Sequence, residues 1–234
     1  MNENTLVAVS CYAGDQHQVE NNLPYYKHHG RPVWLMSPSD APVIGIEGVE
    51  CYAAGKRGWI GPHTLDRQRK FLEKLSQSSY RYFLFNDADS VCLSPTLPDY
   101  LFKHTDTFWS NEVLDTNPGP SRLPKIALQP PYFFSNTVVR ALLRVASVPA
   151  LSYTQATAHG ELPVPTDCVD HWLLQIVYAA GVEHQSFPDG CSWETASSNG
   201  LEQMKIHTGK LGKVFIHSIK TKEVLDALVK SRLG

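Results

Sequence analysis

The sequence lacks any apolar run long enough to span a bilayer, and residues 1–5 are too polar for a signal peptide. It also lacks a C-x-x-C pair, because its five cysteines are scattered: Cys11, Cys51, Cys92, Cys168 and Cys191. In a reducing compartment such cysteines are free thiols, so neither a disulfide framework nor a structural zinc site is expected. We therefore expect a cytoplasmic protein without membrane insertion.

The sequence also has no large excess of positive or of negative charge. The chain has 21 Lys and Arg against 23 Asp and Glu, a net charge of −2. Such a balance gives no support for broad adhesion to nucleic acids or membranes. Hydrophobic residues make up 42% and charged residues 19%, which is typical of a globular core. With no internal repeat, the 234 residues predict one compact domain, 1–234.

Short apolar runs alternate with a helical pattern in the first hundred residues. Strands are predicted at 6–10, 32–36, 49–54 and 80–85, and a helix at 64–75. This order predicts an α/β fold with a mainly parallel central sheet flanked by helices. Later segments predict strands at 108–113, 126–134 and 213–217, and helices at 137–146, 169–180 and 221–233. Residues 115–124, rich in Pro, Gly and Asn, predict a mobile loop bordering the active site.

The strongest motif is Asp87-Ala88-Asp89, which directly follows the apolar segment 80–85 and is the only D-x-D in the sequence. Parallel sheets bind ligands beyond the carboxyl ends of their strands. The small Ala88 allows a tight turn, so that both carboxylates converge on one site. Mg²⁺ and Mn²⁺ prefer oxygen ligands, and a few carboxylates with substrate phosphates hold them. The alternative is a solvated turn in which Asp87 caps the next segment.

The stretch from Tyr82 to Leu93, YFLFNDADSVCL, resembles the D-x-D region of GT-A glycosyltransferases, closest to the glycogenin and galactinol-synthase-like branch. The resemblance implies a single GT-A, Rossmann-like domain. Residues 1–100 would bind the nucleotide sugar, and residues 101–234 would supply acceptor and catalytic groups. The implied reaction moves a sugar from a nucleotide-diphosphate sugar, a UDP-sugar in this branch, to a hydroxyl acceptor. Mn²⁺ or Mg²⁺ would assist departure of the nucleoside diphosphate, and retention of anomeric configuration is favoured.

Two further segments are similar to the donor side of that family. Val9-Ser10-Cys11-Tyr12 is similar to the end of its first strand, so Ser10 and Tyr12 would hold the base, and Ala88 is assigned to donor binding with them. A tyrosine at the edge of the core is the alternative for Tyr12. Thr64-Leu65-Asp66-Arg67 resembles the family's Thr-Leu-Thr-Lys, which makes Arg67 a contact to donor phosphates or sugar. The neighbouring Arg69 and Lys70 are alternatives for that role, and a solvated helix face is the plain alternative.

The segment from Val214 to Lys220 resembles the family's closing strand. There a histidine binds the metal and a following lysine clamps the diphosphate, which assigns these roles to His217 and Lys220. A structural role is the alternative for His217. The chain departs from the pattern in its shorter spacing and in lacking the intervening Gly and the subsequent Pro-Trp.

The run from Asp167 to Leu174 looks like the family's Asp-x-x-Asp-Gln-x-x-Leu, at the start of a helix on the acceptor side. Asp167 and Asp170, one helical turn apart, would contact the transferred sugar and the acceptor, with Asp170 nearest the reacting carbon. His171 replaces the family's Gln. Helix capping is the alternative, and it suits Asp167 better than Asp170.

A segment around Ser135 and Asn136 is similar to the family's Phe-Asn-Ser-Gly strand, although the Gly is missing. The similarity places both side chains in the sugar and acceptor pocket. The sequence does not choose among a glycan, a protein, a small alcohol and a modified DNA base as acceptor.

Two other classes of protein compete with a glycosyltransferase. A sugar-phosphate nucleotidyltransferase would share the nucleotide-binding half, but such enzymes usually carry a Gly-rich loop with Arg and Lys after the first strand. Here the segment from Ser10 to Asp15 has one Gly and no cation. A glycan-binding module without turnover is the third class, with stacking platforms at Trp59, Trp109, Trp172 and Trp193.

Overall fold

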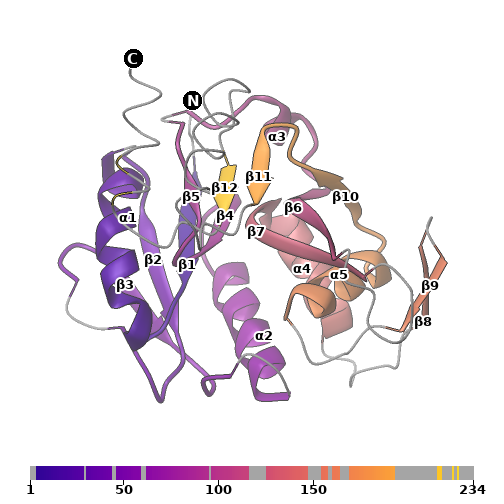
Figure 1. Ribbon diagram of the computed structural model, residues 1–234, viewed down its shortest axis with the longest axis horizontal. Coiled ribbons are helices and arrows are strands. Elements are labelled where there is room, and N and C mark those ends of the chain that lie inside the picture. Colours follow the sequence, from indigo (N-terminus) through magenta and orange to yellow (C-terminus); the bar gives the residue numbers. More distant parts are fainter. Residues whose placement is uncertain are drawn as a thin grey trace.

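The computed structural model describes residues 4–28, 30–43, 46–58, 62–94, 96–115, 125–146, 154–157, 160–163, 169–192 and 215–217, together with Glu223 and Asp226. Its centre is a seven-stranded sheet in the order β10-β6-β7-β4-β1-β2-β3 (Figure 1). The strands are β1 (Thr5–Ser10), β2 (Val33–Ser37), β3 (Glu50–Ala53), β4 (Tyr82–Asp87), β6 (Thr107–Asp115), β7 (Lys125–Ser135) and β10 (Glu183–Ser186).

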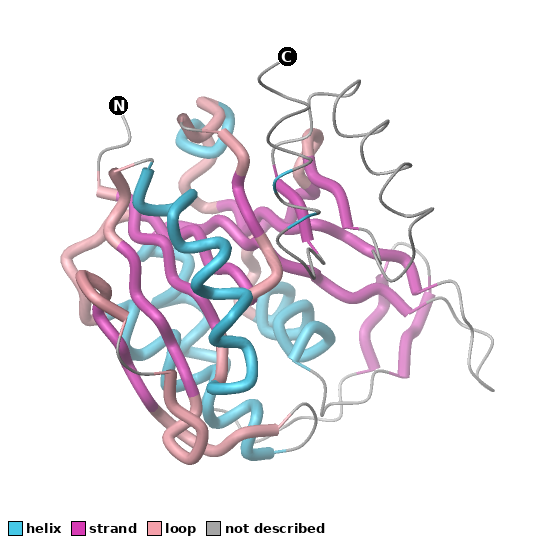
Figure 2. The backbone as a smooth tube through the Cα atoms, turned by 60° about the vertical axis from the view of Figure 1, so that its left-hand side comes forward, coloured by secondary structure: helices cyan, strands magenta, loops and turns pink. Residues whose placement is uncertain are grey.

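Strand β7 is antiparallel to both of its neighbours, whereas the other pairs in the sheet are parallel. Helices lie on both faces of the sheet (Figure 2). Helix α1 (Gln16–His28) packs on one face, and α2 (Pro62–Ser76), α4 (Asn136–Ala146) and α5 (Val169–Ala179) pack on the other. The predicted α/β class, one domain with a mainly parallel sheet flanked by helices, is therefore confirmed.

Alternation along the strands divides the core into two clusters. In β4, Tyr82 and Leu84 pack in the cluster on the side of α1, whereas Phe83 and Phe85 pack in the cluster on the side of α2, α4 and α5. Because successive side chains of a strand point to opposite faces, Asp87 continues on the side of α2. The burial of β4 on both faces thus decides which helix can reach the first aspartate of the D-x-D.

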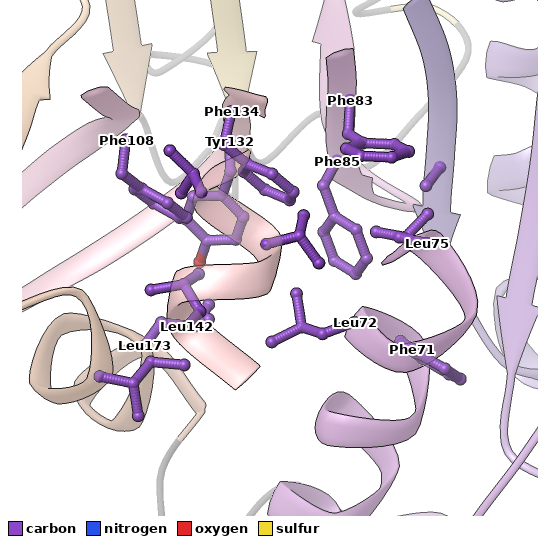
Figure 3. Close-up of a cluster of buried hydrophobic side chains, with 14 of the residues drawn as sticks. Phe71, Leu72, Leu75, Phe83, Phe85, Phe108, Tyr132, Phe134, Leu142 and Leu173 are labelled. Atoms are coloured by element: carbon purple, nitrogen blue, oxygen red, sulfur yellow. The ribbon is translucent and has the colours of Figure 1, made fainter. Parts of the chain in front are cut away.

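Aromatic rings pack together in the cluster on the side of α2, α4 and α5 (Figure 3). The Phe134 ring lies 5.2 Å from the Phe108 ring, 5.9 Å from Phe83 and 6.4 Å from Phe85, measured between centroids. Side chains from α2, α4 and α5 cover these rings, namely Leu72, Leu142 and Leu173. Each aromatic pair stabilises the fold beyond its burial by about 0.5–1.5 kcal/mol.

A smaller sheet, in the order β11-β12-β5, lies above β4 in Figure 1. It contains β5 (Val91–Cys92), β11 (Gly190–Ser192) and β12 (Phe215–His217). Strand β12 is antiparallel to β5, with Ile216 opposite Val91. The buried Phe215 ring stacks on Phe187 at 4.1 Å between centroids. This brings a segment near the C-terminus beside the residues that follow the D-x-D.

The predicted strands and helices are confirmed to within two residues wherever the structure describes them. Of the predicted helix 221–233, only Glu223 and Asp226 are described, and both are helical. Asp115 ends β6, paired with Lys125, rather than beginning a loop, and residues 116–124 lie outside the described part. The sequence analysis missed α1, the 3-10 turn η1 (Ala13–Asp15), α3 (Tyr100–Lys103), β5, β10, β11 and the pair β8 (Thr154–Thr157) and β9 (Gly160–Pro163).

The cysteines whose side chains are described are free thiols, namely Cys11, Cys51 and Cys92. Cys51 is exposed, and the other two are buried. Among the described residues, no helix is both long and apolar enough to cross a membrane.

Truncating the central ring, Phe134→Ala, is expected to lower the free energy of unfolding by about 3–5 kcal/mol, because it leaves a cavity among the neighbouring rings and leucines. Urea unfolding with an unchanged m-value would measure this. The control is Tyr178→Ala, whose side chain is 46% exposed, with an expected loss below about 1 kcal/mol. Equal losses in both variants would contradict the described core.

Candidate functional site

The carboxyl ends of β1, β2, β3 and β4 meet at one edge of the sheet, because these four strands are parallel neighbours. Ser10, the last residue of β1, pairs with Asp87, the last residue of β4, and with Met36 of β2. The parallel register therefore brings the first-strand segment and the D-x-D together, as the sequence predicted.

The D-x-D forms a turn at this edge. The Ser90 backbone N–H donates to the Asp87 carbonyl at 3.0 Å, which closes the turn over Ala88 and Asp89. Asn22, a buried residue of α1, donates through Nδ2 to the Ala88 carbonyl at 2.6 Å. Asp89 is only 8% exposed, so this is not a solvated surface turn. The predicted tight turn is confirmed, and α1 holds it in place.

A third carboxylate, which the sequence analysis missed, stands next to the pair. Asp15 ends η1, where its Oδ2 accepts from the Tyr12 backbone N–H at 3.2 Å. Burial raises the pKa of Asp15, and the nearby charge of Asp89 raises it further. Burial also raises the pKa of Cys11, with added contributions from Asp15 and Asp87. Negative charge is thus concentrated where β1 and β4 end. In the sequence, Asp15 could have been recognised as an acidic residue three positions after Tyr12, just past the first strand.

Tyr12, the predicted stacking residue, is half-buried beside this turn. The Arg57 guanidinium lies over its ring, with Cζ 4.0 Å from the ring centroid. The ring also lies against Gly14, where an added Cβ would stand 2.3 Å from the ring's Cε2 atom. Gly14 therefore leaves room for the ring in this position. Sequence reasoning missed Arg57, because its partner comes from a different strand end.

Arg57 belongs to a loop, residues 55–58, that follows β3. Arg67 of α2 donates from Nη1 to the Lys56 carbonyl at 3.0 Å and from Nη2 to the Gly58 carbonyl at 3.2 Å. Gly55 has φ +65°, and a Cβ on it would lie 2.8 Å from the Arg67 Cβ. Burial lowers the pKa of Arg67, and the charge of Asp87 opposes that change. Arg67 thus holds the loop beside the D-x-D turn.

The two alternatives to Arg67 are occupied with another partner on the exposed side of α2. Asp66 accepts from Lys70 at 2.7 Å and from Arg69 at 3.1 Å, and Arg69 also lies 3.6 Å from Glu73. The hydrogen bonds from Lys70 and Arg69 lower the pKa of Asp66. Arg67, rather than Arg69 or Lys70, is therefore the cation of this segment that faces the site.

Ser135 and Asn136, predicted for the sugar pocket, lie at the opposite end of β4. Ser135 pairs with Tyr82, the first residue of β4, whereas Asp87 is the last. At about 3.3 Å per residue the two ends are roughly 16 Å apart. The Ser135 Oγ accepts from the Val138 N–H at 3.2 Å, and the Asn136 Nδ2 donates to the Tyr80 carbonyl at 3.1 Å. Both side chains secure the start of α4, and the structure does not bring them to the D-x-D turn.

The structure describes the remaining predicted residues only in part. Asp167 and Lys220 lie outside the described residues. Asp170 and His171 are the second and third residues of α5, and His217 ends β12, each with only its backbone described. Within the described part of the chain, no group of three His, Cys, Asp or Glu side chains could hold a metal ion. The predicted Asp87, Asp89 and His217 set stays a prediction.

No protein-family model matches the chain, and no curated protein does. Solved structures are similar over most of its length. One is the 2-C-methyl-D-erythritol 4-phosphate cytidylyltransferase of Thermus thermophilus, at 12% identity and TM-score 0.48, covering 97% of this chain and 98% of that one. A 4-diphosphocytidyl-2C-methyl-D-erythritol synthase has 13% identity and TM-score 0.41, covering 78% and 89%. A protein described as a nucleotide-diphospho-sugar transferase, from Desulfovibrio desulfuricans, has 11% identity and TM-score 0.45, covering 98% of each.

Replacing Asp15 by Asn is expected to stabilise the metal-free protein at pH 7 by no more than about 2 °C in Tm. The folded-state pKa of Asp15 lies above its unfolded value. Ionisation of Asp15 therefore lowers the stability of the fold as pH rises from the unfolded-state pKa through the folded-state pKa. The gain should vanish near pH 3, where the carboxyl is protonated in both states.

Asp66→Asn is the matched control with the opposite sign. Its pKa is lowered in the folded protein, so the ionised form stabilises the fold and its loss should lower Tm slightly at pH 7. Melting curves of both variants at pH 3 and pH 7, in a chelator, make the comparison. A lower Tm for Asp15→Asn than for the wild type at pH 7 would contradict the charge cluster.

Proposed function

We propose that the chain is a metal-dependent glycosyltransferase that uses a nucleotide-diphosphate sugar as donor. The observation that carries the proposal is the meeting of two kinds of group at one sheet edge. Asp87 and Asp89 supply carboxylate oxygens in a turn held by Asn22. Beside them, Tyr12 supplies an aromatic ring with a cation over it. A metal-bound diphosphate needs carboxylate oxygens, and a stacked base needs an aromatic ring close to them.

The carboxylates suit Mn²⁺ or Mg²⁺ by their chemistry and by their electrostatics. Both ions take oxygen ligands and retain positions for phosphate oxygens. The charge of Asp89 raises the pKa of Asp15, so this edge carries negative charge that a cation would offset. The register of β12 on β5 carries His217 toward Ser90, next to Asp89, which supports its proposed role as a ligand. When bound, the cation neutralises charge on the departing nucleoside diphosphate.

Other roles follow the resemblance and are proposed with it. Ser10 and Tyr12 hold the base, which is uracil in the nearest family branch, and Lys220 contacts the diphosphate. Asp170 stands nearest the reacting carbon, with Asp167 beside it and His171 toward the acceptor. The acceptor is a hydroxyl compound, and transfer proceeds with retention.

One observation favours a second candidate, a sugar-phosphate nucleotidyltransferase. The sequence has no cation directly after the first strand, but in the structure Arg57 lies over the Tyr12 ring, and Arg67 bonds the loop that carries Arg57. Cations are thus present at the end of β1 although they come from elsewhere in the chain. The products separate the two candidates. A glycosyltransferase transfers the sugar of a UDP-sugar and releases UDP. A nucleotidyltransferase joins a nucleoside triphosphate to a sugar phosphate and releases pyrophosphate.

The first test is titration of Mn²⁺ by calorimetry with and without UDP. We expect tight binding only when UDP is present, because the protein ligands leave positions for phosphate oxygens. Asp89→Ala should weaken Mn²⁺ binding in the presence of UDP by about tenfold or more. Asp66→Asn, which removes an acid on the exposed side of α2, is the control and should bind as the wild type does. Equal affinity of Asp89→Ala and the wild type would rule out the metal site.

The second test concerns Asp170. Asp170→Asn should retain the fold and donor binding but lower turnover of a UDP-sugar by about 10²–10⁴-fold, as expected for loss of an acid–base or electrostatic group. Asp167→Asn should cost less turnover and more stability, because its position suits a helix cap. A donor-consumption assay with melting curves measures both. Wild-type turnover by Asp170→Asn, with an inactive Asp167→Asn, would reverse the assignment.

A further inference from the structure

Arg57 lies over one face of the Tyr12 ring. Its guanidinium Cζ lies 4.0 Å from the centroid of the Tyr12 ring. A guanidinium is planar and stacks on aromatic faces as a flat ring does. A planar base that stacked on this face would need the position that the cation takes, so both cannot hold it at once.

The backbone that carries Arg57 is fixed, although the side chain is exposed. The Arg57 backbone N–H donates to the Asp40 Oδ1 at 2.8 Å. The carbonyls on either side, of Lys56 and Gly58, accept from Arg67 at 3.0 and 3.2 Å. Three hydrogen bonds thus hold the loop at successive residues. The side chain of Arg57, with its several rotatable bonds, can leave the ring without any of these hydrogen bonds being broken.

The same contacts place the loop next to the proposed phosphate end of the site. Ser10 pairs with Asp87, and Arg57 of the loop lies over the ring of Tyr12, two residues after Ser10, so the loop and the D-x-D turn share one edge of the sheet. A guanidinium that leaves Tyr12 remains tethered at the same edge of the sheet as that turn. Charge-assisted contacts to phosphate are among the strong hydrogen bonds of proteins.

We propose that Arg57 is a movable cover of the base site: the base displaces its guanidinium from Tyr12, and the guanidinium then binds the diphosphate of the same ligand. Arg67 is the positioning residue that holds the loop for both states. This inference rests on the proposed nucleotide site and deepens it, since it assigns base and diphosphate opposite effects on one side chain.

The relative strengths of the two stacking interactions favour this exchange. An exposed cation–π contact corresponds to about a two- to fivefold effect on a binding constant. Stacking of a base on an aromatic side chain corresponds to about five- to 150-fold. The base therefore displaces the guanidinium from the ring. A nucleoside without phosphates loses affinity by this displacement, because the freed guanidinium has no phosphate to bind.

The experiment compares uridine and UDP binding by calorimetry, with Mn²⁺ present, for the wild type and Arg57→Ala. We expect Arg57→Ala to bind uridine about two- to fivefold more tightly, because no cation has to leave Tyr12. It should bind UDP about fivefold or more weakly, because the contact to phosphate is lost. Lys56→Ala, a loss of the same charge from the same exposed loop, is the matched control. It should leave uridine binding unchanged and weaken UDP less than Arg57→Ala does.

Arg67→Ala tests the positioning role, with melting curves to confirm folding. Release of the loop should tighten uridine and weaken UDP in the same direction as Arg57→Ala. If Arg57→Ala leaves uridine affinity unchanged or lowers it, while the wild type binds UDP, the cover is refuted and the nucleotide site remains. If the wild type binds neither uridine nor UDP, the proposed function and the cover both fail.

Discussion

The double burial of β4 is the constraint on which the site depends. Its residues alternate between two apolar clusters, so a slip by one position would move each side chain into the opposite cluster, where it would no longer fit its neighbours. The register with β1 is fixed in turn, and it ends with Ser10 opposite Asp87. The polar groups that follow both strands meet at the one edge where the core stops. The aspartates gain their position from hydrophobic packing rather than from any attraction among themselves.

Much of this arrangement was predictable because it follows from local patterns. Apolar runs of β-prone residues mark β1, β2 and β4, and their alternation with a helix indicates a parallel sheet. A parallel sheet brings strand ends together, which is why the proximity of Ser10 and Asp87 could be predicted. Even the tight turn at Ala88 follows from residue size. Each of these features needs knowledge of one segment and of a general rule of sheet geometry.

The missed features depend on pairs of distant residues. Helix α1 shows few apolar side chains, and its buried Asn22 has a backbone carbonyl at Ala88 as partner, which no local pattern reveals. The contact of Arg57 with Tyr12 joins the ends of two different strands, so neither segment alone indicates it. The misplacement of Ser135 has the same origin. The motif resembled a sugar-pocket segment, but β7 runs antiparallel and delivers its last residue to the far edge of the sheet.

The pairing of β12 with β5 has a consequence for how the protein is made. Val91 and Ile216 come from opposite halves of the chain, so their contact closes a very long loop of polypeptide. Long-range pairings of this kind form late, because the loop-closure entropy must be overcome before the contact is gained. During synthesis the D-x-D turn emerges together with β1 and β4, but the strand beside it emerges only after β6, β7 and α5 have been made. A nascent chain thus carries its acidic turn without the neighbouring strand until then, and chains that stop before β12 lack it permanently.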